Sequence, residues 1–162
     1  MADFELDATD LRILAKLQEE ARLTNVELAE AVGLSASPCA RRVQALERAG
    51  IIDRYVTLLD PAKIGLHVSV YISVTLERQV EEALQIFESA VRSYPEVMEC
   101  HLMTGDADYL LRVVVPDLGS YQTFLLEKLT RIPGVTNIKS SFALKQVSYR
   151  TALPLEQLSS RH

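Results

Sequence analysis

The sequence predicts an α+β protein with a three-helix N-terminal head and a C-terminal body in the order β-α-β-β-α-β. Apolar residues recur every three or four positions over the first fifty residues, and the period changes to two from Leu66 onward. Pro and Gly residues separate the later segments. We expect a head over residues 1–60, a linker over 61–65, a body over 66–150 and a tail over 151–162.

The first two helices carry recognisable start and stop signals. Asp7 is a good N-cap for a helix in which leucines recur at helical spacing. Thr24 followed by Glu27 forms the pattern of a capping box, in which each residue bonds the backbone of the other. Gly33 ends the second helix because glycine readily adopts the left-handed conformation found after a helix.

A third helix is expected to begin after Ser35 or Ser37, with Pro38 tolerated in its first turn, and to end at Gly50. The tight glycine-containing turn before it makes the last two helices a helix-turn-helix. The head is therefore predicted to be a three-helix unit of this type.

The body begins after a β-rich stretch over residues 51–60, which we expect to form a short strand before the linker. Residues 66–76 alternate between apolar and polar positions, as in a strand with one buried face. An amphipathic helix follows and stops at Pro95, then strands over 97–103 and 109–115, a helix around 121–129 and a last strand over 137–147. This order is that of a ferredoxin-like fold.

The third helix carries the most chemical information. Cys39, Val43 and Leu46 share one face, which is expected to pack on the other helices. The opposite face offers arginine, glutamine and serine side chains, which can hydrogen-bond guanine, adenine and either bases or phosphates. Arg42 lies to the side, where a phosphate contact is expected. The candidate DNA-binding residues are Ser35, Ser37, Arg41, Arg42, Gln44 and Arg48.

Net charge alone gives a misleading impression of the head. The chain carries a formal charge of −5, and residues 1–30 are rich in acids. Residues 31–59, in contrast, contain four arginines and two acids. Because DNA responds to where positive charge is gathered, the third helix can serve as the cationic surface of the head.

Several motifs together resemble the leucine-responsive, or Lrp/AsnC, family of feast/famine regulators. They are Leu34-Ser35-x-Ser37, Arg41-Arg42-Val43-x-x-Leu46-Glu47-x-x-Gly50-Ile51-Ile52, Leu59-Asp60-Pro61, Gly105-Asp106-x-Asp108-Tyr109-Leu110-Leu111 and Pro133-Gly134-Val135. The resemblance covers nearly the whole chain in matching order. It implies a winged helix-turn-helix head, a ligand-sensing body, and homodimers that associate further, commonly as tetramers or octamers.

The segment 104–108 lies between two expected strands and has three local interpretations. It suits a hairpin turn, and its Asp-x-Asp pattern suits a metal site, although no third ligand can be located. A glycine turn also exposes backbone N–H groups that can hold a carboxylate, while an aspartate can accept from an ammonium group. The resemblance implies that this loop contributes to an effector pocket between subunits. The candidate effector-binding residues are Thr104, Gly105, Asp106 and Asp108, with Ser140 and Ser141 as weaker candidates.

The sequence therefore predicts a cytoplasmic transcriptional regulator that binds a pseudo-palindromic duplex as a dimer. A small amino acid is expected to modulate its DNA affinity or its assembly. No signal peptide is visible, no stretch reaches the ~20 apolar residues of a membrane helix, and no cofactor is expected. Cys39 and Cys100 follow no metal-ligand spacing and are expected to be reduced, packed thiols. The alternatives are an enzyme, for which no catalytic pairing can be placed, and an interaction module whose head binds protein.

Overall fold

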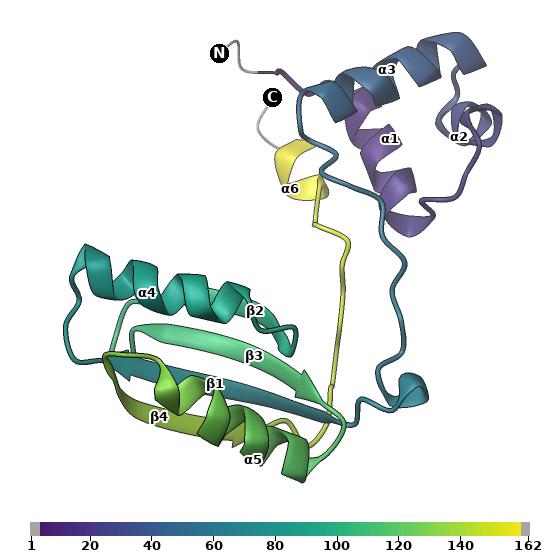
Figure 1. Cartoon of the computed structure of the whole chain (residues 1–162). Helices are drawn as coiled ribbons and strands as arrows, with labels where there is room; N and C mark the ends of the chain where they lie inside the picture. Colours follow the sequence, from purple (N-terminus) through teal and green to yellow (C-terminus); the bar gives the residue numbers. More distant parts are fainter. Residues whose placement is uncertain (1–3, 160–162) are drawn as a thin grey trace. The chain divides into compact units, whose positions relative to one another are not determined.

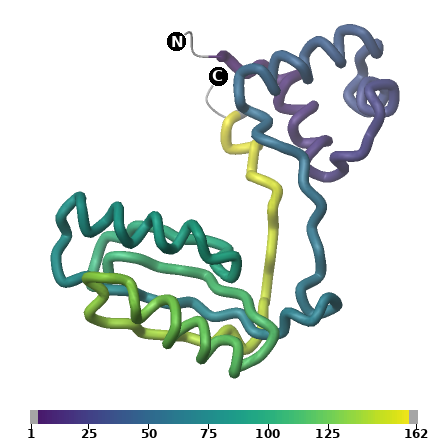
Figure 2. Tube along the Cα trace, viewed as in Figure 1, coloured from purple at the N-terminus to yellow at the C-terminus, as the bar shows by residue number. Residues whose placement is uncertain are grey.

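The computed structural model describes residues 4–159, which form two compact units. The first unit, the head, comprises the residues up to Thr57 together with those from Ser148 onward. The second unit, the body, spans Leu58–Val147. The chain therefore passes between the units twice, once after the head helices and again after the last strand, as the trace in Figure 2 shows.

The head contains the three expected helices, α1 (Ala8–Glu19), α2 (Asn25–Val32) and α3 (Ala36–Arg48). Asp7 caps α1, and Thr24 and Glu27 form the predicted capping box at the start of α2. Gly33 adopts the left-handed conformation, with φ of 73°, and so turns the chain from α2 into α3. These local predictions are confirmed.

The three helices enclose one apolar core. Each helix contributes residues at helical spacing, and the chain after α3 and the C-terminal segment add partly buried residues such as Ile51 and Leu155. The fully packed members are Ile13, Leu14, Leu28, Ala29, Val32, Cys39, Val43 and Leu46. The core thus fixes which face of α3 points inward.

The body has the predicted element order: β1 (Val68–Leu76), α4 (Glu81–Arg92), β2 (Val97–Leu102), β3 (Tyr109–Val115), α5 (Leu118–Glu127) and β4 (Val135–Phe142). Short 3₁₀ turns precede β1, at Ala62–Ile64, and follow α5, at Leu129–Arg131. The four strands pair antiparallel in the order β2-β3-β1-β4. The ferredoxin-like arrangement is confirmed.

Both body helices cover the same face of this sheet (Figure 1). Alternate residues of the central strands, such as Ile72 on β1 and Leu111 on β3, pack against Phe87 of α4 and Phe124 of α5. The intervening residues of the strands form the opposite face. Because side chains alternate along a strand, neighbouring residues of one strand lie on opposite faces of the sheet.

Three sequence predictions need correction. Residues 51–60 form no strand, because no segment among residues 4–159 pairs with their backbone in a ladder. The last strand covers Val135–Phe142 instead of residues 137–147, because its pairing with β1 begins at Leu76 and ends at Val70. Cys39 is buried as expected, but Cys100 is exposed because β2 is an edge strand of the sheet.

Candidate functional site

The outward face of α3 presents the side chains that the sequence singled out for DNA. Ser37, Arg41, Gln44 and Arg48 are all exposed, whereas Cys39 and the other apolar members of the helix are buried. The first turn of α3 contains no acid, and Arg48 lies in its last turn. The predicted division of α3 into an apolar and a cationic face is confirmed.

The acidic neighbour of Arg48 is engaged elsewhere. The Glu47 side chain accepts a hydrogen bond from the Tyr55 hydroxyl at 2.9 Å. Burial and this contact raise the pKa of Tyr55 to about 12, so the hydroxyl stays protonated and remains a donor. The bond ties the Glu47 carboxylate to the chain that follows α3.

Ser35 is the N-cap residue of α3, and its backbone carbonyl accepts from the Cys39 N–H at 3.2 Å. Its side chain makes no capping hydrogen bond and is exposed. The Ser35 hydroxyl is therefore available at the positive end of the helix dipole, a position that suits a phosphate oxygen.

Arg42 is placed differently from the expected phosphate contact. Its Nη1 atom lies 2.7 Å from Oδ2 of Asp7 and 2.8 Å from Oδ1 of Asp10. The Asp10 carboxylate is almost completely buried. The guanidinium of Arg42 therefore links α3 to the first turn of α1 within the head.

The turn between β2 and β3 exposes three of the four residues that the sequence proposed for effector binding. Thr104, Gly105 and Asp106 are exposed. Gly105 has a φ of 123°, a conformation that residues with a Cβ atom rarely adopt. The turn closes through the N–H of Met103, which donates to the carbonyl of Asp108 at 2.8 Å. The backbone conformation at this position therefore requires the glycine.

Asp108 points into the body instead of toward solvent. Its side chain accepts hydrogen bonds from the backbone N–H of Leu76 at 2.7 Å and from Nε2 of Gln79 at 2.5 Å. Its own N–H donates to the carbonyl of Val74 at 2.9 Å. With only 4 % of its surface exposed, Asp108 ties the turn to the end of β1.

Ser140 and Ser141 lie on opposite faces of the sheet. Ser140 pairs across the sheet with buried Ile72 and its hydroxyl contacts the Tyr121 hydroxyl of α5. Ser141 pairs with Tyr71 and is exposed on the face that carries no helices. The two hydroxyls therefore do not belong to one site within this body.

Sequence reasoning missed the partners that engage these charges. The sequence indicates Asp7 as a cap but not as a partner of Arg42, and no pattern in it singles out Gln79. The available signal was the helical angle: Arg42 is about 40° from Leu46, on the side of α3 that faces the core. For Gln79 no local pattern pointed to Asp108, since the two are brought together only by the sheet.

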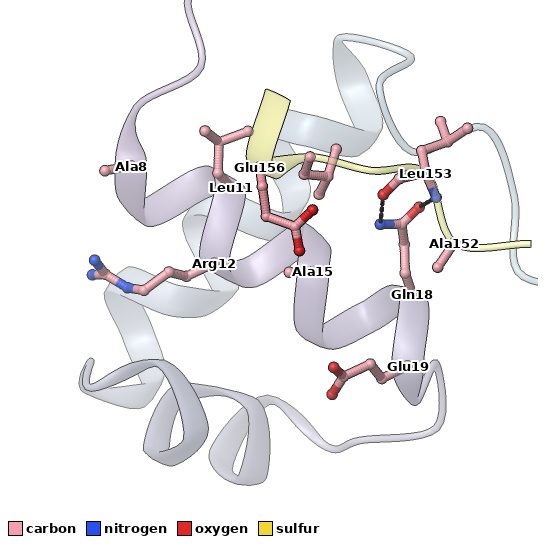
Figure 3. A pocket seen from close by; sticks show the side chains of 10 residues that line it. Ala8, Leu11, Arg12, Ala15, Gln18, Glu19, Ala152, Leu153 and Glu156 are labelled. Carbon is pink, nitrogen blue, oxygen red and sulfur yellow. Dashed lines mark hydrogen bonds between the residues drawn. The ribbon is translucent and has the colours of Figure 1, made fainter. Parts of the chain in front are cut away.

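The C-terminal segment also contributes to the head. The Gln18 side chain pairs with both backbone groups of Leu153, donating to its carbonyl at 3.2 Å and accepting from its N–H at 2.7 Å (Figure 3). A shallow cleft of about 410 Å³ lies between α1 and this segment and is lined by residues of both, among them Arg12 and Glu156. The tail is therefore part of the folded head.

Among residues 4–159 no cluster of three or more His, Cys, Asp or Glu side chains is arranged to hold a metal ion. Over the same residues, no helix has the length and hydropathy needed to span a bilayer.

Comparison with known proteins gives matches over both units. Residues 6–53 match the winged helix-turn-helix DNA-binding family, and residues 69–153 match the Lrp/AsnC ligand binding domain. The Bkd operon transcriptional regulator of Pseudomonas aeruginosa is 50% identical over 151 residues, covering 93% of this chain and 99% of that protein. The leucine-responsive regulatory protein of Escherichia coli is 40% identical over 152 residues, covering 94% and 93%.

Solved structures match most of the chain. A transcriptional regulator of Neisseria meningitidis in complex with L-Met superposes with a TM-score of 0.91 at 44% identity, covering 95% of this chain and 99% of that one. AsnC of E. coli gives a TM-score of 0.84 at 25% identity, covering 92% and 99%. With a helix-turn-helix head, a ferredoxin-like body and these matches across both, the chain belongs to the Lrp/AsnC family of transcriptional regulators.

Proposed function

We propose that this regulator reads a pseudo-palindromic duplex with two copies of α3, and that a small amino acid bound by the body modulates that interaction. Arg41, Gln44 and Arg48 are the proposed base-contacting residues, and Ser35 and Ser37 the proposed phosphate contacts. The carrying observation is that no hydrogen bond or ion pair within residues 4–159 engages the side chain of Arg41, Gln44 or Arg48. A polar helix face with uncommitted donors can enter the major groove without first breaking internal contacts.

The direct test uses a duplex selected from a random pool by the wild-type protein. Arg41→Ala should weaken specific binding about tenfold or more, since a bidentate arginine contact contributes about 1–3 kcal/mol. Arg92→Ala, which removes the same charge from an exposed position on α4, is the matched control and should leave binding unchanged. If the wild type selects no duplex, or if Arg41→Ala binds as the wild type does, the proposal is wrong.

Salt dependence separates this function from an interaction module whose head binds protein. Each phosphate contact releases counterions, so the logarithm of affinity should fall with the logarithm of salt concentration at about −0.9 per contact. A protein-binding head would give no such dependence because it would not bind DNA.

For the effector, we propose the turn that exposes Thr104, Gly105 and Asp106. Its glycine presents backbone N–H groups to a carboxylate, and Asp106 can accept from an ammonium group. The relative solved with L-Met and the leucine-responsive relatives make L-methionine and L-leucine the first ligands to test. Asp108, which is consumed by contacts inside the body, supports the turn instead of touching the ligand.

Calorimetry against the twenty amino acids tests this assignment. Asp106→Ala should remove the heat of binding, whereas Asp53→Ala, an exposed position in the head, should not. Binding should change DNA affinity by about 5- to 150-fold, the usual range for coupling between sites. No heat with any amino acid would remove the effector proposal while leaving DNA binding intact.

We also propose that the functional unit is a homodimer that can associate further to a tetramer or octamer. The extended chain after α3 exposes the large apolar side chains of Tyr55, Val56, Leu58 and Leu59. Exposed apolar residues that cluster in this way are typical of a surface that a protein partner covers. Sedimentation of the wild type and of Leu58→Ser with Leu59→Ser tests the proposal: the variant should shift toward the monomer.

A further inference from the structure

We propose that Arg42 is a positioning residue that sets the rotation of α3 about its own axis, and not a contact to DNA. This inference rests on the proposed function, in which α3 reads the duplex. The side chains of Arg42, Asp7 and Asp10 form a bracket that joins the middle of α3 to the first turn of α1.

All four carboxylate oxygens of the bracket are used. Asp7 Oδ1 accepts from the N–H groups of Thr9 and Asp10, both at 2.8 Å, while its Oδ2 accepts from Arg42. Asp10 Oδ2 accepts from the N–H of Asp7 at 3.2 Å, and its Oδ1 accepts from Arg42. The cap of α1 and the anchor of α3 are therefore one hydrogen-bonded network.

The charges of the bracket disfavour a phosphate contact. One guanidinium faces two carboxylates, so the cluster carries a net negative charge toward an approaching phosphate. Drawing Arg42 away would also leave the carboxylate of Asp10, of which 6% is exposed, buried without its cation. Breaking a buried pair by removing one partner is costly because the remaining charge keeps its desolvation penalty.

Directional bonds at this position have a geometric consequence. Apart from Arg42, α3 contacts α1 and α2 through apolar residues such as Cys39 and Leu46, and hydrophobic contact is not directional. Charge-assisted hydrogen bonds fix both distance and angle. Because Arg42 is about 100° from Arg41 around the helix, anchoring Arg42 determines where Arg41 points.

The decisive variant is Asp10→Asn, for which the two interpretations of Arg42 give opposite signs. If Arg42 contacts phosphate, removing a competing carboxylate frees the guanidinium, and DNA binding stays the same or strengthens. If the bracket positions α3, Asp10→Asn weakens binding of the selected duplex about tenfold relative to a scrambled duplex, as loss of a coupled pair would. Arg42→Gln should then reproduce this loss, and the double variant should be no worse than the weaker single variant.

The salt dependence gives an independent readout. Arg42→Gln should leave the slope of log affinity against log salt unchanged, whereas loss of a phosphate contact lowers it by about 0.9. A lowered slope for Arg42→Gln, or unchanged or tighter binding by Asp10→Asn, overturns the proposal.

Folding of the variants is controlled in two ways. Asp7 is half exposed, so Asp7→Asn removes one arm of the bracket under a milder perturbation and should show a smaller loss in the same direction. Urea unfolding of Arg42→Gln, Asp10→Asn and the double variant measures the bracket without DNA. Additive destabilisation there overturns the bracket itself, whereas failure of the wild type to select any duplex overturns only the proposed function.

Discussion

Helix α3 and the turn between β2 and β3 each place an exposed charged side chain close in sequence to one that is engaged by other residues. On α3, Arg41 is free and Arg42 is held by two carboxylates. At the turn, Asp106 is exposed and Asp108 is held by Leu76 and Gln79. In both regions we propose that the engaged residue fixes the geometry and that the exposed residue contacts the ligand. Charge in a motif therefore does not by itself identify the side chain that touches the partner.

The largest expected effect sharpens the contrast at the turn. Asp108→Ala removes a buried acceptor and leaves the N–H of Leu76 and the amide of Gln79 without a partner, so the free energy of unfolding should fall by about 2–3 kcal/mol. Asp106→Ala, at an exposed position, should change it by no more than about 0.5 kcal/mol. Urea denaturation of the two variants checks this, and equal stabilities would abolish the distinction between them.

On the helix, the corresponding test is the free amide of Gln44. Gln44→Ala removes a candidate bidentate contact to adenine, so affinity for the selected duplex should fall by about 1–2 kcal/mol. The free energy of unfolding should stay within about 0.5 kcal/mol, because the side chain is exposed. Gel-shift titration and urea unfolding measure the two quantities. A large loss of stability would place Gln44 with the engaged residues.

A smaller effect concerns the support of α1, on which the bracket depends. Gln18→Ala removes both hydrogen bonds to Leu153, so the free energy of unfolding of the head should fall by about 1 kcal/mol. Gln157→Ala, on the short helix α6 (Glu156–Ser159), is the matched control because it removes an exposed glutamine side chain from the C-terminal segment that contains Leu153. Hydrogen exchange should show the amide of Leu153 losing protection in the first variant only. Unchanged protection would mean that the tail is held by Leu155 and not by Gln18.

The smallest expected effect is a pH dependence of the bracket. Hydrogen bonds from the backbone of Asp10, and then from Arg42, lower the pKa of Asp7 below its ordinary 3.8. A carboxylate with a lowered folded pKa contributes stability above its unfolded value and loses it as pH falls through the folded one. Head stability should therefore decrease below about pH 4, and less steeply in Asp7→Asn. Backbone hydrogen bonds also lower the pKa of Glu27 and of Asp117, so these groups add to the loss of stability at low pH. The difference in stability between wild type and Asp7→Asn is therefore the quantity to measure.

Local rules predicted the parts of this protein that depend on neighbouring residues. The capping pair Thr24 and Glu27, the left-handed Gly33 and the buried face of α3 all follow from spacings of three or four residues. Prediction failed at residues 51–60, where apolar and β-branched residues suggested a strand, and at the end of β4, which stops at Phe142. A strand forms only where another backbone supplies hydrogen bonds, which a single segment does not reveal.

By itself, the sequence determined the helices, the strand order and the outward position of Arg41, Gln44 and Arg48, because helix periodicity and strand alternation are properties of consecutive residues. Only the tertiary structure decided that Arg42 and Asp108 are engaged, and that Ser140 and Ser141 are divided between two faces of the sheet. Their partners lie about thirty residues away along the chain or across the sheet. Whether a charged side chain has a partner inside the protein depends on which distant groups the fold brings within hydrogen-bonding distance.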